Sequence, residues 1–199
     1  MPNFEIEKQK NSEGYLNVCG CDEAGRGPLC GPVVAAAVIL PVDIIIEGLD
    51  DSKKLSEKKR EMLYDKIIDC AIAFGIAQAS PEEIDQFNIL NASMLAMQRA
   101  IDLLSVKPDC ALIDGNCNRG FSLPAFAVVK GDSKSMSIAA ASILAKVTRD
   151  RMCLDLDAEF PLYGISRHKG YPTKDHMDAV RLYGPSPIHR KSFLKFLDK

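Results

Sequence analysis

The apolar positions along the chain fall into five short runs that are typical of β-strands. These runs span residues 16–22, 31–40, 71–79, 109–114 and 125–129. The second run is almost entirely apolar and rich in Val and Ala, so we expect that strand to be buried. Strands come first along the chain, and later ones alternate with helices. This order predicts an α/β fold with a mixed sheet of about five strands flanked by helices.

Helix-start signals lie between and after these runs. The residues predicted to cap helices have a side-chain oxygen that can accept a backbone N–H bond, and they are Ser56, Ser80, Asn88 and Thr173. Ser80 opens a capping box with proline at the first helical position. A long helix rich in Ala, Ile and Leu is expected over residues 133–157, and the helix after Thr173 should end at Gly184.

Composition narrows the class of protein. The chain has 199 residues, of which 47% are hydrophobic, enough to form a core without disulfides. The first 15 residues contain no apolar segment typical of a secretory signal, and the apolar run 33–42 is too short to cross a bilayer. The seven cysteines are an odd number, and no pair has zinc-site spacing. We therefore expect a cytoplasmic protein with reduced thiols and no membrane segment.

The net charge of −2 conceals a marked asymmetry. Residues 163–199 carry eight Lys and Arg against three acids, a charge of +5, which leaves −7 on the remainder. A basic end on an acidic body suits a polyanionic partner. Charge alone fits a solvated helical surface slightly better. If the partner is a nucleic acid, the residues from Pro185 onward are expected to make only non-specific phosphate contacts.

Four acidic residues end apolar stretches and stand near glycines. They are Asp22, Glu23, Asp114 and Asp132. Loops at strand ends of α/β sheets collect functional groups. Carboxylates gathered from distant segments repel one another unless a cation neutralises them, and Mg²⁺ and Mn²⁺ prefer such oxygen ligands. Two ions of this kind can clamp a phosphodiester. The pattern therefore indicates metal-dependent phosphoryl or phosphodiester chemistry.

A structural interpretation of each acid is also open, because carboxylates at strand ends serve as caps and turn residues. Asp22 and Glu23 are adjacent, and successive residues of a regular strand point to opposite faces. Either the backbone bends there, as the nearby glycines would allow, or the longer Glu23 side chain reaches round. Asp132 lies in a Lys-Gly-Asp-Ser turn, so we expect its placement to be less rigid than that of the strand-end acids.

At residues 21–32, Cys-Asp-Glu-Ala-Gly-Arg-Gly-Pro-Leu-Cys-Gly-Pro, the sequence closely resembles the ribonuclease HII family, type 2 ribonuclease H. Further matching segments follow in the family's order, at residues 51–55, 113–116, 130–134, 139–150, 170–174 and 189–193. The resemblance covers nearly the whole chain from about residue 16. It implies the RNase H-like fold with a C-terminal helical extension, here divided as a catalytic domain over 1–160 and a basic extension over 161–199 packed on the same unit.

The resemblance also implies an activity: endonucleolytic cleavage of the RNA strand of RNA–DNA hybrids, and nicking at ribonucleotides embedded in duplex DNA, leaving 5′-phosphate and 3′-hydroxyl ends. Catalysis would use two Mn²⁺ or Mg²⁺ ions held by Asp22, Glu23, Asp114 and Asp132. Gly25, Arg26, Gly27 and Tyr171 would recognise the RNA–DNA junction, and the candidates for phosphate contacts are Lys53, Lys54, Lys146 and Arg149. The expected partners are nucleic acids, with no membrane, and the expected state is a monomer.

Two other classes of function remain open at this point. A non-catalytic nucleic-acid-binding domain of the same fold would be signalled by loss of one carboxylate, and all four are present. A phosphatase or 3′–5′ exonuclease would usually show Asp-x-Asp or Asp-x-Glu at the first strand, whereas Asp22 and Glu23 are adjacent. The basic C-terminal region also favours a long polyanion over a small phosphate ester.

Overall fold

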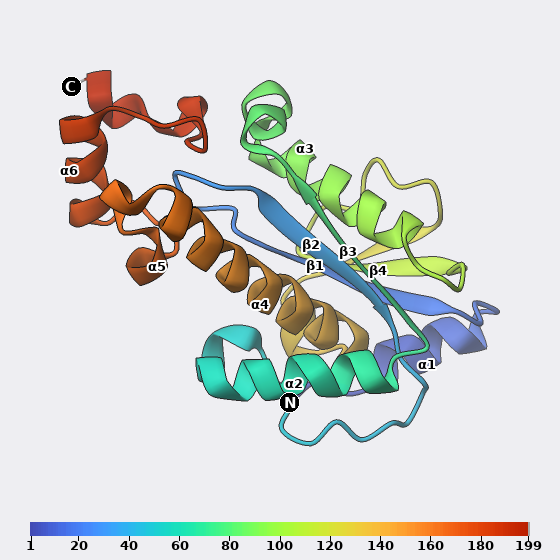
Figure 1. Cartoon of the computed structure of the whole chain (residues 1–199). Coiled ribbons are helices and arrows are strands. Elements are labelled where there is room, and N and C mark those ends of the chain that lie inside the picture. Colours follow the sequence, from blue (N-terminus) through green and yellow to red (C-terminus); the bar gives the residue numbers. More distant parts are fainter. Residues whose placement is uncertain (199) are drawn as a thin grey trace.

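The structure is a computed structural model that describes residues 1–198. Its centre is a five-stranded sheet in the order β3-β2-β1-β4-β5 (Figure 1). The strands are β1 (Val18–Ala24), β2 (Val33–Ile39), β3 (Ala73–Ala79), β4 (Cys110–Asp114) and β5 (Ala125–Val128). β1, β2 and β3 pair antiparallel, whereas β1, β4 and β5 pair parallel. The expected mixed sheet is confirmed, with β1 beginning and ending two residues later than predicted.

Helices cover both faces of this sheet. The α-helices are α1 (Glu5–Ser12), α2 (Glu57–Cys70), α3 (Pro81–Asp102), α4 (Met136–Glu159), α5 (Ile165–His168) and α6 (Lys174–Tyr183). The predicted caps are confirmed: the hydroxyls of Ser56, Ser80 and Thr173 each accept a backbone N–H. Asn88, with φ of 66°, kinks α3, and its side chain accepts the N–H groups of Leu90 and Asn91. The sequence signal at Asn88 therefore marks a kink between two helical segments.

Helix α1 was not predicted, because its sequence is almost wholly polar. It is anchored by Glu7, whose carboxylate accepts the hydroxyl of Ser135 at 2.6 Å and the N–H of Ser137 at 2.9 Å. A buried, hydrogen-bonded carboxylate thus docks the helix together with the few apolar contacts made by Phe4 and Ile6. The contact ties α1 to the first turn of α4.

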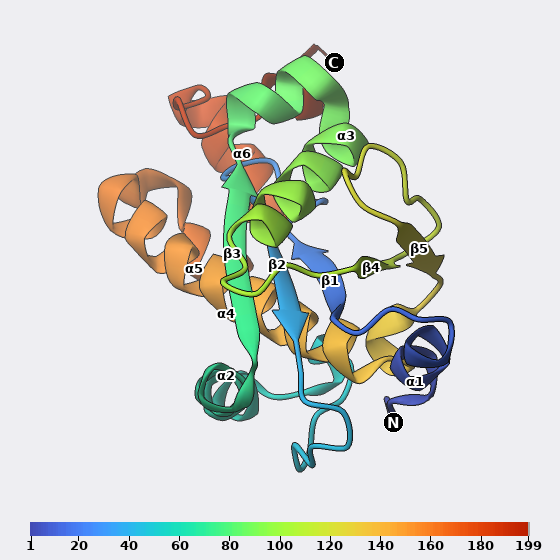
Figure 2. The same ribbon diagram turned by 90° about the vertical axis from the view of Figure 1, so that its right-hand side faces the viewer.

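α3 and α4 lie on opposite faces of the sheet (Figure 2), and each face carries its own hydrophobic core. α3 packs on β2 and β3, and Cys19 and Cys21 lie in this core as small apolar groups. α4 crosses the opposite face over β1 and β2, with α2 beside it. The approach is closest at Gly20, where a Cβ atom would lie 2.2 Å from the carbonyl carbon of Ser137. Only glycine permits α4 to lie so near the central strand.

The C-terminal residues form a compact unit at one end of the sheet, beside the loop that joins β1 and β2 (Figure 1). Its apolar cluster includes Leu29, Cys153 and Leu194. The expectation that residues from Pro185 onward supply only phosphate contacts is wrong, because His189 and Arg190 are buried there. Lys199, one of the basic residues counted in this tail, lies outside the described residues. Among residues 1–198, no helix is long and apolar enough to cross a membrane.

Replacing Gly20 with alanine is expected to lower the free energy of unfolding by about 1–3 kcal/mol or more, because the added methyl group would overlap backbone atoms of α4. Urea unfolding followed by circular dichroism measures the change. Ser137→Gly should not rescue the variant, since the two nearest obstructing atoms, the carbonyl carbon of Ser137 and the nitrogen of Ile138, belong to the main chain. A Gly20→Ala protein as stable as the wild type would contradict the close approach of α4.

Candidate active site

Asp22 and Asp114 lie side by side at the carboxyl ends of two adjacent parallel strands. The register pairs Cys21 with Ile113, so the next residues along β1 and β4 are these two aspartates. Both belong to the face covered by α4, because Gly20, two residues before Asp22, meets Ser137 of that helix. The sheet itself therefore brings two carboxylates from distant parts of the chain together.

Glu23 reaches the same place by a different route. β1 keeps its regular pairing with β2 through Glu23 and Ala24, so the backbone does not bend between Asp22 and Glu23. The turn comes afterwards, at Gly25, which has φ of 100°. Pairing with β4 has ended by then, and the Glu23 carboxylate lines the same cavity as Asp22 and Asp114. Of the two alternatives left open by the sequence, the longer side chain provides the solution.

Asp132 lies in a short 3₁₀ helix, Gly131–Ser133, directly before α4. The expectation of a loosely held turn is wrong. The N–H of Gly131 donates to the Asp114 carboxylate at 2.7 Å, the N–H of Ser135 donates to the Gly131 carbonyl at 2.8 Å, and Asp132 is only 6% exposed. Asp114 therefore fixes the backbone of the segment that carries Asp132.

The electrostatics of the cluster are those of crowded anions. Burial, followed by the charges of Glu23 and Asp114, raises the pKa of Asp22 well above its usual range. Burial raises the pKa of Glu23 despite the guanidinium of Arg26 at 3.1 Å, and burial with Asp114 raises that of Asp132. One lysine, Lys53, approaches Asp132 at 3.8 Å. An excess of buried carboxylate oxygens with little compensating charge is the donor set that hard divalent cations require.

Two adjoining cavities surround this cluster. The first, of about 380 Å³, is lined by three of the carboxylates and by other sequence-predicted residues, namely Asp22, Glu23, Asp114, Gly25, Arg26, Gly27, Lys53, Lys146, Arg149 and Tyr171. The second, of about 490 Å³, is lined by Lys54 and Asp132 and shares Lys53 and Asp114 with the first. The structure thus brings all twelve predicted site residues to one end of the sheet.

The loop after β1 requires glycine at position 25 for steric reasons. Gly25 adopts φ of 100°, and a Cβ atom there would lie 2.0 Å from Nε of Arg149. Arg149 is itself buried, and its other nitrogens donate to the carbonyls of Lys169 at 3.0 Å and Cys30 at 3.4 Å. These bonds favour a role in holding backbone segments together, and the phosphate contact predicted for Arg149 stays a prediction.

The three lysines differ in how free their ammonium groups are. The side chain of Lys53 is 80% exposed, and Lys54 is paired with Asp50 at 3.3 Å. Lys146 is paired with Asp150 at 2.5 Å within α4. Lys53 is therefore the lysine best placed to meet an incoming anion at the rim of the carboxylate cluster.

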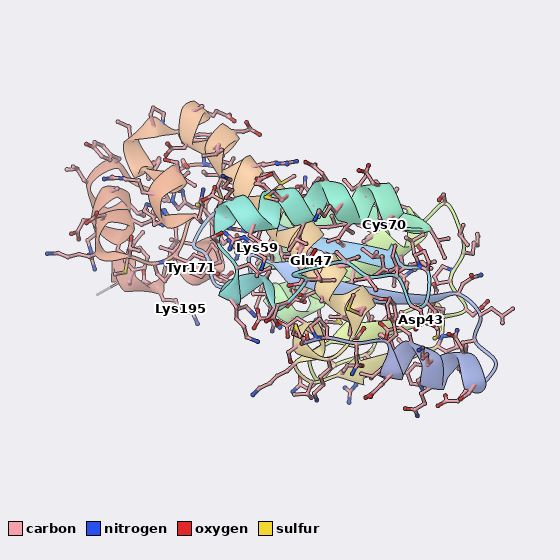
Figure 3. All side chains as sticks on the ribbon, turned by 90° about the horizontal axis from the view of Figure 1, so that it is seen from below. Asp43, Glu47, Lys59, Cys70, Tyr171 and Lys195 are labelled. Carbon is pink, nitrogen blue, oxygen red and sulfur yellow. The ribbon has the colours of Figure 1, made fainter. Side chains whose placement is uncertain are left out.

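Tyr171 comes from the C-terminal extension and lies where that unit meets the body of the domain (Figure 3). The residue is 47% exposed, so it is not a core aromatic. A Cβ atom at Gly27 would lie 3.3 Å from Cε1 of this ring. The aromatic ring and the glycine loop are therefore in contact beside the carboxylates, which sequence spacing alone could not show.

Sequence reasoning missed several residues that build the site. The hydroxyls of Ser52 and Ser142 are 2.9 Å apart in the first cavity, and a hydrogen bond from Ser142 partly offsets the raised pKa of Asp22. Serines on a buried helix face give no distinctive signal. The family-like segment 139–150 contains Ser142, however, and its position on the face of α4 toward β1 was the available clue.

A buried group of Cys30, His176 and His189 also brings three possible metal ligands within 4.8 Å of one another. The histidines are already satisfied. The N–H of Ser186 donates to Nδ1 of His189 at 3.1 Å, which leaves the His189 proton on Nε2, and Nε2 of His189 lies 3.2 Å from Nε2 of His176. Nδ1 of His176 then donates to the Tyr171 carbonyl at 3.0 Å. This relay supports the backbone beneath Tyr171.

Comparison with solved structures fits this geometry. Ribonuclease H2 from Pyrococcus horikoshii OT3 has a TM-score of 0.74 and 30% sequence identity, covering 92% of this chain and 97% of that one. The sheet topology and the strand-end carboxylates accordingly define a nuclease of the ribonuclease H class. The family model for ribonuclease HII matches residues 19–196.

Relatives in sequence narrow the class further. Ribonuclease HII from Coxiella burnetii is 59% identical over 178 residues, which are 89% of this chain and 88% of that protein. The enzyme from Caldicellulosiruptor saccharolyticus is 52% identical over 192 residues, 96% and 94% of the two chains. The chain belongs to the ribonuclease HII family, whose members are metal-dependent endoribonucleases.

Asp22→Asn and Asp114→Asn are each expected to abolish cleavage while leaving the metal-free protein at least as stable as the wild type. A carboxylate whose folded-state pKa is raised destabilises the fold when ionised, above its unfolded-state pKa, and this cost disappears for Asp22 on substitution by the neutral amide. Urea unfolding in chelator at pH 7, with cleavage assayed in Mg²⁺ and Mn²⁺, tests both parts. Wild-type turnover in either variant would remove that residue from the site.

The histidine pair predicts a second pH effect, of opposite sign. Burial, then His176, lowers the pKa of His189 to about 4 in the folded protein. The unfolded chain therefore takes up protons first, and the contribution of His189 to stability should fall as the pH drops below about 6.5, by about 2 kcal/mol between pH 7 and pH 5. Urea unfolding of the wild type and of His189→Gln at both pH values isolates this contribution, because the raised-pKa carboxylates act alike in the two proteins. Equal pH dependence in the two proteins would contradict a buried neutral imidazole.

Proposed function

We propose that this ribonuclease HII cuts the RNA strand of RNA–DNA hybrids and also nicks duplex DNA at single embedded ribonucleotides. The contact between Tyr171 and Gly27 carries the proposal. This contact places an exposed aromatic ring beside a glycine loop that a nucleic-acid backbone can approach closely. Both line the cavity that also contains Asp22, Glu23 and Asp114. A single ribonucleotide offers one 2′-hydroxyl to recognise, so the protein groups that recognise it must be held in fixed positions beside the reacting phosphate.

The carboxylates would hold two divalent cations, Mg²⁺ or Mn²⁺, and such ions would supply water activation and charge stabilisation at the leaving 3′-oxygen. Asp22 and Glu23 would supply oxygens from β1, Asp114 from the end of β4, and Asp132 from the turn that Asp114 anchors. The fit rests on the four carboxylates gathered around the two cavities. Burial, and then mutual repulsion, raises the pKa values of Asp22 and Asp132, and a bound cation would favour their ionised forms. A substrate panel in Mg²⁺, Mn²⁺ and chelator tests the proposal.

Substrate recognition is divided between the backbone and side chains of this cavity. Gly25 and Gly27 have no side chain, so a sugar–phosphate chain can approach their backbone groups closely. The Tyr171 ring, held against Gly27, would stack on the neighbouring sugar or base. Lys53 would meet the phosphate backbone at the rim, and Arg26 faces Glu23 with half of its side chain exposed. A nucleic-acid strand that crosses this cavity would contact the ribose-recognising groups and the carboxylates at the same time.

Tyr171→Ala should impair nicking at a single embedded ribonucleotide more than cleavage of a long hybrid. A long hybrid offers many productive registers, whereas a single ribonucleotide offers one. Loss of a stacking contact of about 1–3 kcal/mol would slow the single-site reaction roughly 5- to 150-fold. Paired cleavage assays on the two substrates measure the difference.

Tyr183→Ala is a matched control, because Tyr183 is an exposed tyrosine of the same extension outside the cavity. It should leave both activities unchanged, and Tyr171→Phe should retain most of the single-ribonucleotide activity. An equal loss on both substrates for Tyr171→Ala would mean that the ring serves packing and that the junction is recognised elsewhere.

A further inference from the structure

We infer that Arg190 is the positioning residue that holds the Gly25–Pro32 loop in its substrate-reading shape. Arg190 is fully buried. Its guanidinium donates to five backbone carbonyls, those of Gly25 at 2.7 Å, Arg26 at 3.1 Å, Pro28 at 2.8 Å, Gly31 at 2.9 Å and Pro32 at 3.2 Å. All five acceptors belong to one loop, so a single side chain sets the direction of most of its peptide groups. The inference rests on the proposed function, because it concerns how that loop recognises a ribonucleotide.

The loop cannot set its own conformation. Three of its eight residues are glycines, and Gly25 and Gly31 have positive φ, so local preference leaves many shapes open. Pro28 and Pro32 have no N–H, which leaves the loop with fewer donors than acceptors. The fork of N–H groups on Arg190 supplies the missing donors from outside.

The charge balance of Arg190 points the same way. No carboxylate pairs with its guanidinium among the described residues, and its compensation comes from the five carbonyl dipoles. Burial, then the nearby Arg149, lowers its pKa to about 9, so the group is still charged at neutral pH. A buried cation is costly unless it is fully hydrogen-bonded. Loop and arginine therefore depend on each other: either one alone would leave buried polar groups without partners.

The backbone strengthens this connection. The N–H of Arg190 donates to the Leu29 carbonyl at 2.8 Å, and the N–H of Gly31 donates to the Ile188 carbonyl at 2.9 Å. The neighbouring His189 supports the Tyr171 carbonyl through His176. Two consecutive residues of the C-terminal extension thus hold the two elements proposed to recognise the ribonucleotide, the glycine loop and Tyr171.

Arg190→Lys is the test variant, since it keeps the charge but offers three donors from one atom in place of the planar fork. We expect single-ribonucleotide nicking to fall roughly 10- to 100-fold relative to hybrid cleavage, measured where circular dichroism shows the protein folded. Hydrogen exchange followed by mass spectrometry should show faster exchange in residues 25–32. Lys195→Gln, which removes an exposed charge of the same segment (Figure 3), should change neither measurement.

The outcomes separate the two proposals. A wild-type protein that cleaves hybrids but does not nick at single ribonucleotides would refute the proposed function. A wild-type protein that nicks, with an Arg190→Lys variant that is folded and keeps both the substrate ratio and slow exchange in the loop, would refute the role of Arg190. A loss that is equal on both substrates would also refute it, because general destabilisation acts on both alike.

If Arg190→Lys does not fold, the wild-type protein still provides a test. Native-state hydrogen exchange in low denaturant should give the N–H groups of Leu29, Gly31 and Arg190 one common opening reaction, because breaking the guanidinium contacts frees both segments. Exchange of the loop through a smaller opening, while Arg190 stays protected, would show that the loop holds its shape without this residue.

Discussion

The close packing of α4 on β1 is the contact on which the site depends. At Gly20 the helix backbone comes within the space that a side chain would fill, and this fixes α4 over the end of the strand that carries Asp22. The turn before α4 then places Asp132 at the cluster, and the helix itself contributes Ser142, Lys146 and Arg149 to the cavity lining. A helix held further away would separate these groups from the strand-end carboxylates. The missing side chain at one position thus permits the assembly of a site drawn from separate segments of the chain.

Strand pairing and the packing of α4 together gather the carboxylates, and this arrangement has an electrostatic cost. The cost appears as raised pKa values at Asp22, Glu23 and Asp132, and it is only partly offset by Lys53, Arg26 and Ser142. A fuller set of lysines would stabilise the metal-free protein but would compete with a cation for the same oxygens. Incomplete compensation is therefore what keeps the cluster able to bind divalent ions.

Much of this arrangement could be predicted from sequence, for identifiable reasons. Strands and caps follow local rules, so Ser56, Ser80 and Thr173 were placed correctly, and the acids next to glycines marked the end of the sheet. Helix α1 was not predicted, because a buried carboxylate anchors it and its sequence shows no regular apolar stripe. The fixed backbone of the Asp132 turn was not predicted, because the Gly131 N–H donates to the carboxylate of Asp114, a residue distant in sequence. What could not be predicted in each case was a long-range polar contact, which leaves no periodic pattern in the chain.

The C-terminal extension shows why its charge was a misleading guide to its role. Its basic composition suggested a surface that holds phosphates, yet its most buried cation, Arg190, faces backbone carbonyls and not solvent. Arginine fits this place because its N–H fork satisfies several carbonyls at once, which an ammonium group cannot do. Catalytic carboxylates can be held by a sheet, since strand register fixes them. A glycine loop that must approach a nucleic acid closely has no side chains to fix it, so its shape has to be imposed by a neighbour. The residues proposed to recognise the ribonucleotide therefore lie on both sides of the boundary expected near residue 160.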